Sequence, residues 1–114
     1  MNVIYDDYWK NLIKEAHRTA VDHGFTESTF GERIALIHSE ASEALEDLRN
    51  GRAPNEFYYS DFPGRKPCGI PVEFADIIIR ILDACGKYDI DIYRAIVEKM
   101  AYNKTRPFKH NRTM

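Results

Sequence analysis

Apolar residues recur along the first half of the chain with the three-to-four-residue spacing of amphipathic helices. In residues 6–23 the apolar residues with this spacing are Trp9, Leu12, Ile13, Ala16 and Ala20. In residues 29–50 they are Ile34, Ile37, Ala41, Ala44, Leu45 and Leu48. Gly24 and Gly51 follow the two segments, as glycine commonly does after a helix. The pattern therefore predicts two long helices.

A third helix is expected over residues 71–86, because Pro71 suits a first helical turn and Gly86 suits a helix end. Apolar residues cover most of its circumference, which is typical of a central, buried helix. A fourth helix is expected over residues 91–104, with Pro107 as the stop. The fold class predicted is therefore all-α, with a four-helix bundle as the subunit.

The segment between the second and third helices, residues 51–70, is rich in proline, glycine and aromatic residues. We expect a structureless loop here, which serves either as a lid or binding loop or as a wrap around the bundle or a neighbouring subunit. Residues 1–107 are predicted to form one domain, and residues 108–114 a mobile basic tail.

The composition narrows the class of protein. The 114 residues are 44% hydrophobic and 30% charged, which is ordinary for a soluble globular domain. No apolar run is long enough to span a bilayer, and the first residues do not read as a signal peptide. Cys68 and Cys85 lack the spacing of a metal site, so we expect two reduced thiols in a cytoplasmic protein with no membrane association.

Charge is distributed unevenly along the chain. Residues 29–50 carry five acids and two bases, whereas residues 99–114 carry five bases and no acid. The two regions could hold a cation and a polyanion side by side, although a solvated helix face and a basic tail would give the same pattern. The net charge of −2 does not favour a nucleic-acid partner.

Two pairs of acids share one spacing. Glu40 and Glu43 lie three residues apart, and Glu73 and Asp76 repeat this in the third helix, so each pair lies on one helix face. Adjacent like charges are tolerated when a cation lies between them; the alternative is an ordinary solvent-facing edge. If the pairs face each other, four carboxylates without cysteine or histidine favour Mg²⁺, with Mn²⁺ as a substitute.

Since Mg²⁺ typically bridges carboxylates to phosphates, the expected ligand carries phosphate. Candidate phosphate-binding residues are Arg80, one turn beyond Asp76, and a group in the fourth helix, Lys99, Asn103, Lys104 and Arg106. A base near a helix C-terminus can also complement the helix dipole. Tyr5, Tyr8, Trp9, Phe57 and Tyr58 could stack on a base, although Trp9 also fits the core stripe. His17 and His38 receive no role.

Glu40-x-x-Glu43 followed by Glu73-x-x-Asp76 resembles the paired signature of the MazG-like, all-α nucleoside triphosphate pyrophosphohydrolases. The segments GRKPCGIPVEFADIIIRILD and EKMAYNKTRP also resemble this family, and the resemblance covers residues 34–112. It implies Mg²⁺-dependent hydrolysis of an NTP or dNTP to the monophosphate and pyrophosphate, in house-cleaning or pool control. It also implies a helical homo-oligomer, a dimer or tetramer. By motif match, the catalytic metal ligands would be Glu40, Glu43, Glu73 and Asp76, and Asn103 and Lys104 would contact substrate.

The apolar third helix independently predicts a homo-oligomer, because one chain of this length cannot cover it. Either Glu43 or Glu40 is expected to accept a proton from the attacking water. Two other functions fit the same residues. One is a non-catalytic helical interaction module, and the other is a metal-dependent hydrolase of a different di- or triphosphate substrate.

Overall fold

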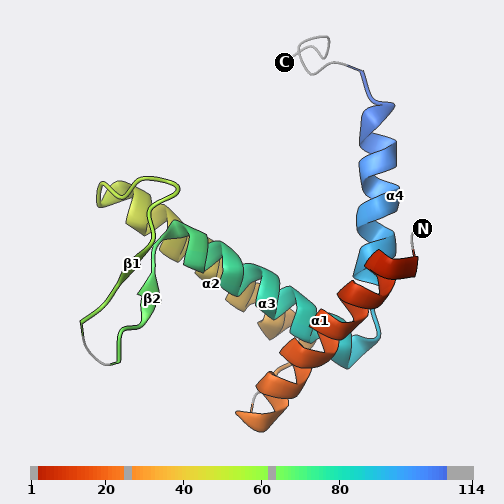
Figure 1. Ribbon diagram of the computed structural model, residues 1–114, viewed down its shortest axis with the longest axis horizontal. Coiled ribbons are helices and arrows are strands. Elements are labelled where there is room, and N and C mark those ends of the chain that lie inside the picture. The colour runs from red at the N-terminus through yellow and green to blue at the C-terminus, as the bar shows by residue number, and fades with distance from the viewer. Residues whose placement is uncertain (1–2, 25–26, 62–63, 108–114) are drawn as a thin grey trace.

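The computed structural model describes residues 3–24, 27–61 and 64–107. The elements are α1 (Val3–Asp22), α2 (Phe30–Arg49), β1 (Tyr58–Tyr59), β2 (Pro67–Cys68), α3 (Ile70–Tyr88) and α4 (Ile92–Lys104). The chain is mostly helical, as predicted (Figure 1). The tail expected at residues 108–114 lies outside the described residues.

Helix α3 is the centre of the molecule. Helix α2 lies along one side of it, and α1 crosses its C-terminal half (Figure 1). The two long helices are antiparallel, since Phe30 at the start of α2 packs edge-on against Tyr88 at the end of α3, with ring centroids 4.8 Å apart. The buried apolar residues are Ala44, Ile70, Leu82, Ala84 and Cys85. The core is therefore small and follows α3.

Local signals explain where two of the helices begin. The Thr29 hydroxyl accepts the Glu32 backbone N–H at 3.1 Å, and the Glu32 carboxylate accepts the Thr29 backbone N–H at 2.9 Å. This reciprocal capping box satisfies two donors at the start of α2. At the start of α4, the Asp91 carboxylate accepts the Arg94 backbone N–H at 3.1 Å. The four predicted helices are confirmed to within a few residues at their ends.

The third helix ends two residues after Gly86, its predicted end. Helix α3 continues to Tyr88, and Asp89 caps it in the left-handed conformation with φ 54°. Gly86 lies where α1 crosses α3, and a Cβ atom there would lie 2.6 Å from the Cβ atom of His17. The glycine therefore allows two helices to approach closely, which an isolated helix pattern does not reveal.

The segment predicted to be a structureless loop contains a small antiparallel hairpin. Tyr58 pairs with Cys68 and Tyr59 pairs with Pro67. The hairpin extends from the N-terminal end of α3 (Figure 1). Gly69, with φ 117°, leads back into α3, and a Cβ atom there would lie 2.3 Å from the Glu56 carbonyl oxygen. Only glycine fits this close crossing of the chain.

Helix α4 leaves the rest of the molecule (Figure 1). Near its start, Tyr93 stacks on Trp9 of α1 with ring centroids 6.4 Å apart, so Trp9 packs within the protein. Every residue from 98 to 107 is exposed. The radius of gyration is 17.0 Å, against about 13 Å for a compact chain of this length. The described residues form three packed helices and a projecting fourth, and the four-helix bundle stays a prediction.

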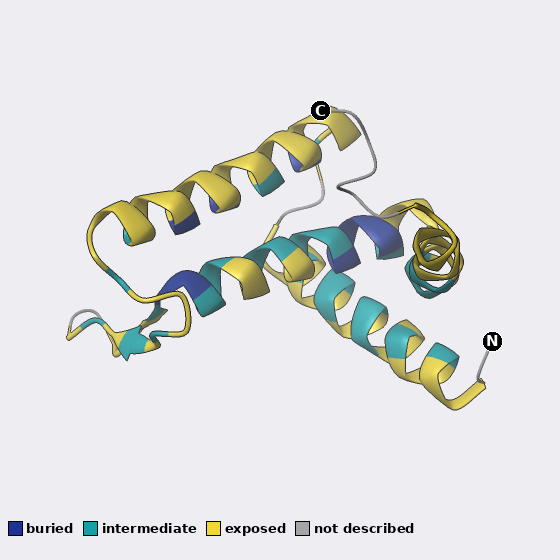
Figure 2. Ribbon diagram, turned by 90° about the horizontal axis from the view of Figure 1, so that it is seen from above, coloured by how far each residue is buried: buried dark blue, intermediate teal, exposed yellow. Residues whose placement is uncertain are grey.

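Much of α2 and part of α3 is exposed (Figure 2), and large apolar side chains are among the exposed residues. Six of them are between 45% and 57% exposed: Ile34, Leu45, Leu48, Phe74, Ile78 and Ile79. Exposed apolar surface of this kind usually marks a contact with another molecule. None of the described helices combines the length and the apolar character needed to cross a membrane.

Candidate metal centre and adjoining cavity

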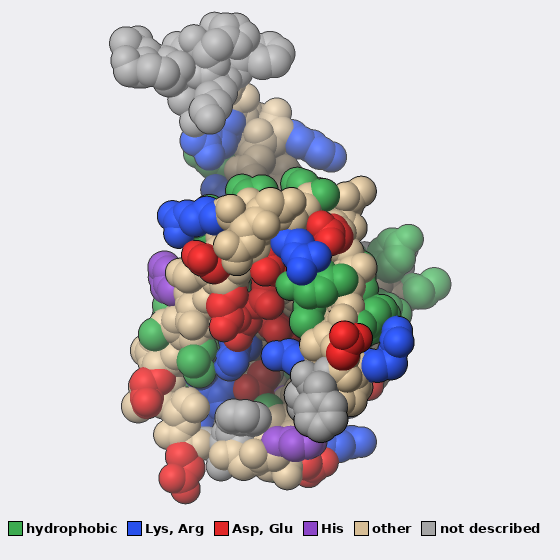
Figure 3. Space-filling view, turned by 90° about the vertical axis from the view of Figure 1, so that its left-hand side faces the viewer, with side chains coloured by type: hydrophobic (Ala, Val, Ile, Leu, Met, Phe, Trp, Pro, Cys, Tyr) green, Lys and Arg blue, Asp and Glu red, His purple; other side chains and the backbone are tan. Residues whose placement is uncertain are grey.

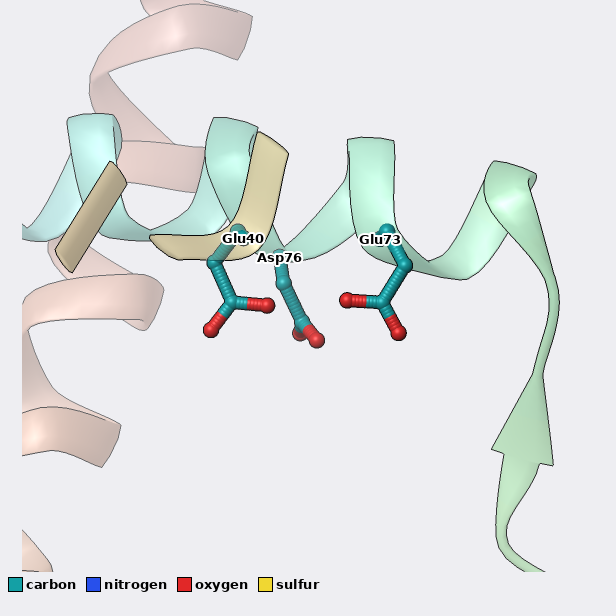
Figure 4. A group of neighbouring side chains, drawn as sticks. All are labelled: Glu40, Glu73 and Asp76. Atoms are coloured by element: carbon teal, nitrogen blue, oxygen red, sulfur yellow. The ribbon is translucent and has the colours of Figure 1, made fainter. Parts of the chain in front are cut away.

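Three acidic side chains converge where α2 passes the start of α3. Glu40 extends from α2, and Glu73 and Asp76 extend from α3 towards it (Figure 4). A carboxylate oxygen of each lies within 4.8 Å of an oxygen of the other two. Glu40 is only 8% exposed. Seen from the hairpin end of the molecule, acidic side chains gather in a hollow of the surface (Figure 3).

Glu43 lies one turn beyond Glu40 on α2, and its side chain is exposed. It does not belong to the close group of three. Its carboxylate nevertheless lies near enough to help raise the pKa of Glu73. The structure therefore brings three of the four predicted ligands together and leaves the fourth beside them.

The group carries more negative charge than its surroundings balance. Burial, followed by the Glu43 and Glu40 carboxylates, raises the pKa of Glu73 to about 8. Burial and the charge of Glu40 also raise the pKa of Asp76. Among the described residues, Glu73 Oε2 is shielded from solvent and has no hydrogen-bond partner. A buried, unpaired acid oxygen beside two other acids fits a divalent cation with oxygen ligands.

Glu40 is held differently from its two neighbours. The Nε and Nη2 atoms of Arg80 each lie 3.1 Å from Glu40 Oε1. Burial alone would raise the pKa of Glu40, but hydrogen bonds from Glu73, Arg80 and Glu43 outweigh it and lower the pKa. Arg80, which we expected to bind phosphate, therefore borders the acidic group and keeps Glu40 ionised.

A second charged cluster lies further along the same face of α3. Asp83 Oδ2 accepts a hydrogen bond from Arg33 Nη1 of α2 at 2.5 Å, and Asp83 Oδ1 accepts one from His17 Nδ1 of α1 at 2.9 Å. Arg33 and Asp83 are 6% and 8% exposed. This network joins the three packed helices through one buried carboxylate.

The sequence pattern does not predict this second cluster. In that pattern Arg33 is only a charge, His17 has no role, and Asp83 is one of the polar positions of the third helix. The available signal was spacing, because Arg33 precedes Glu40 by seven residues and Asp83 follows Asp76 by seven. Residues seven apart lie on the same helix face, two turns from each other.

A cavity of about 340 Å³ connects the two clusters. Asp76 and Arg80 line it near the acidic group, and Arg33 and Asp83 line it two turns away. Its other lining residues are Ala16, Thr19, Ala20, His23, Ser28, Leu36 and Ile79. Its volume is in the range of small-molecule sites, and no aromatic residue predicted to stack on a base lines it.

The predicted substrate-binding residues in α4 and just after it are not brought to this site within one chain. Lys99, Asn103, Lys104 and Arg106 are exposed on the projecting part of the molecule. Helix α4 follows the C-terminal end of α3, whereas Glu73 and Asp76 lie near the N-terminal end of α3 (Figure 1). Contact between these residues and a phosphate at the acidic group would need a second chain.

Comparison of the chain with protein-family models, curated proteins and solved structures finds no match.

Proposed function

We propose that this protein is a Mg²⁺-dependent nucleoside triphosphate pyrophosphohydrolase of the MazG-like kind, which converts an NTP or dNTP and water to the monophosphate and pyrophosphate. The observation that carries the proposal is the convergence of Glu40, Glu73 and Asp76 beside a cavity of about 340 Å³. The resemblance of the two acidic motifs to that family supports the same conclusion.

Glu40, Glu73 and Asp76 would hold the metal, with Glu43 beside them. The donors are all carboxylate oxygens, which suits Mg²⁺ and, as a substitute, Mn²⁺. When bound, the metal would neutralise phosphate charge and lower the pKa of a water molecule. The raised pKa values of Glu73 and Asp76 fit this assignment, because a cation relieves the repulsion that raises them.

The other residues of the site take separate roles in this proposal. Arg80 orients Glu40 and keeps it ionised through its two contacts to Oε1. Glu43, outside the close group, accepts the proton of the attacking water. The water oxygen bonds to the α-phosphorus while the bond from that phosphorus to the bridging oxygen breaks. Pyrophosphate then leaves with the electron pair.

The proposal includes a homo-oligomer, a dimer or tetramer. Helices α2 and α3 expose apolar side chains that a second chain would cover. A second chain could also bring the basic part of α4 to the phosphates. Light scattering at micromolar concentration is expected to give at least a dimer, and a monomer would contradict this part of the proposal.

The test is to measure pyrophosphate and orthophosphate release from a panel of ribo- and deoxyribonucleoside triphosphates, with Mg²⁺ and with EDTA. We expect pyrophosphate without orthophosphate from at least one substrate, and none with EDTA. No turnover of any substrate would overturn the proposal and favour the interaction module. Orthophosphate as the product would mean that the bond broken is not the one proposed.

A further inference from the structure

The Arg33–Asp83 pair lies outside the proposed chemistry, yet it lines the same cavity as Asp76 and Arg80. Asp76 and Asp83 are seven residues apart on α3, which is about 10 Å along the helix axis. The cavity therefore has two polar ends on one helix face. That arrangement suits a nucleotide, in which the phosphates and the edge of the base lie at opposite ends of the molecule.

The two ends differ in charge. At the far end, the Asp83 carboxylate is paired with the Arg33 guanidinium, so the formal charges of the pair cancel. At the near end, Asp76 belongs to a group of three acids. Metal-bound phosphates suit the acidic end, and an uncharged base suits the end where charges are already paired. The apolar side chains of Ala16, Ala20, Leu36 and Ile79 also line the cavity, which suits a flat ring.

Asp83 is a fixed hydrogen-bond acceptor at this far end. A carboxylate offers two acceptor positions on each oxygen. Among the described residues, Arg33 takes a position on Oδ2 and His17 takes one on Oδ1. Each oxygen thus retains one position. Because Asp83 lines the cavity and His17 does not, the histidine contacts the carboxylate from outside the cavity.

We propose that Asp83 determines base specificity by accepting a hydrogen bond from the exocyclic amino group of the base. This inference rests on the proposed function and names its substrate class: nucleotides of cytosine or adenine. Uracil, thymine or hypoxanthine would set a carbonyl oxygen against the carboxylate in place of that amino group. Sites built around a hydrogen bond strongly reject analogues that cannot make it.

The experiment measures kcat/KM with Mg²⁺ for two matched pairs of substrates, CTP with UTP and ATP with ITP, and for the deoxyribose forms. We expect the amino-bearing member of at least one pair to be favoured by about thirtyfold or more. Asp83→Asn should reduce this ratio by about tenfold or more, because the new amide can donate to a carbonyl.

The matched control is Asp89→Asn. It makes the same chemical change at the end of the same helix, outside this cavity, where asparagine also tolerates the left-handed conformation. The ratio between the paired substrates should not change in this variant. A loss of packing alone would lower the rates with both substrates together, so the ratio separates specificity from stability.

Each outcome decides between the two proposals. A ratio below about threefold in both pairs, or a preference for the carbonyl-bearing members, overturns the role of Asp83 and leaves the proposed function standing. If Asp83→Asn leaves the ratio unchanged, the role of Asp83 is likewise overturned and the proposed function stands. No turnover of any substrate overturns both. If Asp83→Asn does not fold, Asp83→Glu keeps the charge while displacing the oxygens, and should lower kcat/KM for the amino-bearing member alone.

Discussion

The two ends of the polar face of α3 differ in whether their buried acidic groups are balanced by basic ones. At the N-terminal end, Glu73 and Asp76 meet a third acid, Glu40, and the pKa of both α3 residues is raised. At the C-terminal end, Asp83 meets Arg33 and His17. A surplus of acid favours the binding of a cation, whereas the charges of a matched pair are balanced within the protein. The same helix therefore carries an unbalanced acidic group at one end and a charge-balanced pair at the other.

The largest expected effect is on catalysis at the acidic end. Asp76→Asn removes a charge from the group of three while keeping the shape of the side chain, so turnover should fall by about 10³-fold, or about 4 kcal/mol. Pyrophosphate release measures the loss, and circular dichroism should show unchanged helicity. Asp47→Asn, on the same helix as Glu40, is the control and should stay within about threefold of wild type. Comparable activity in both variants would refute the metal site.

Without metal, removing the carboxylate at the C-terminal end of α3 should destabilise the protein more than removing one at the N-terminal end. Asp83→Ala leaves the buried Arg33 guanidinium without this carboxylate and should lower the free energy of unfolding by about 3–5 kcal/mol. Asp76→Ala relieves repulsion among like charges and should be neutral or stabilising in EDTA. Urea unfolding of both variants measures the difference. Equal destabilisation would show that the acidic end is also balanced within the chain.

The pH dependence of stability should come from Glu73. Its pKa is raised in the folded protein from the ordinary 4.5 to about 8, so the folded chain binds more protons than the unfolded chain between these values. The contribution of this group to stability is therefore complete below about pH 4.5 and is lost as the pH rises through about 8.

Thermal unfolding in EDTA and in Mg²⁺, at about pH 6 and about pH 8.5, tests this. The midpoint in EDTA should be lower at the higher pH, and Mg²⁺ should raise it more there. Glu73→Gln should lose most of this trend. A wild-type midpoint in EDTA that rises between the two pH values would contradict the origin assigned to it.

The smallest expected effect concerns His17. His17→Gln removes one hydrogen bond to Asp83 but leaves the Arg33 pair in place, so it should lower the free energy of unfolding by about 1 kcal/mol. Chemical denaturation measures the change. A loss as large as that of Asp83→Ala would show that the histidine, rather than the arginine, stabilises the buried carboxylate.

Much of the fold and the two acidic pairs could be predicted, because each helix and each pair depends on residues a few positions apart. Apolar spacing located the helices, and the spacing of Glu40 with Glu43 and of Glu73 with Asp76 placed acids on defined faces. The Asp83 network was missed because it depends on how three helices are aligned. No single helix pattern contains that information.

The remaining differences have the same physical origin. Gly86 looked like a helix end because its contact with α1 involves a residue 69 positions away, His17. Arg80 looked like a phosphate ligand because its partner, Glu40, lies on another helix. The direction of α4 depends on the surface against which it packs. The apolar pattern of a projecting helix does not identify that surface.

The antiparallel packing of α2 and α3 also affects which alignment of the two helices is favoured during folding. Arg33 opposes Asp83, and Glu40 lies beside Asp76. If α2 slid by seven residues in one direction, its apolar stripe would still meet α3, but Glu40 would oppose Asp83. In the other direction Asp83 would lose Arg33. The charges at the two ends thus disfavour misaligned packings of α2 and α3 during folding. A substitution in the site is therefore compatible with the fold only if it preserves this alignment.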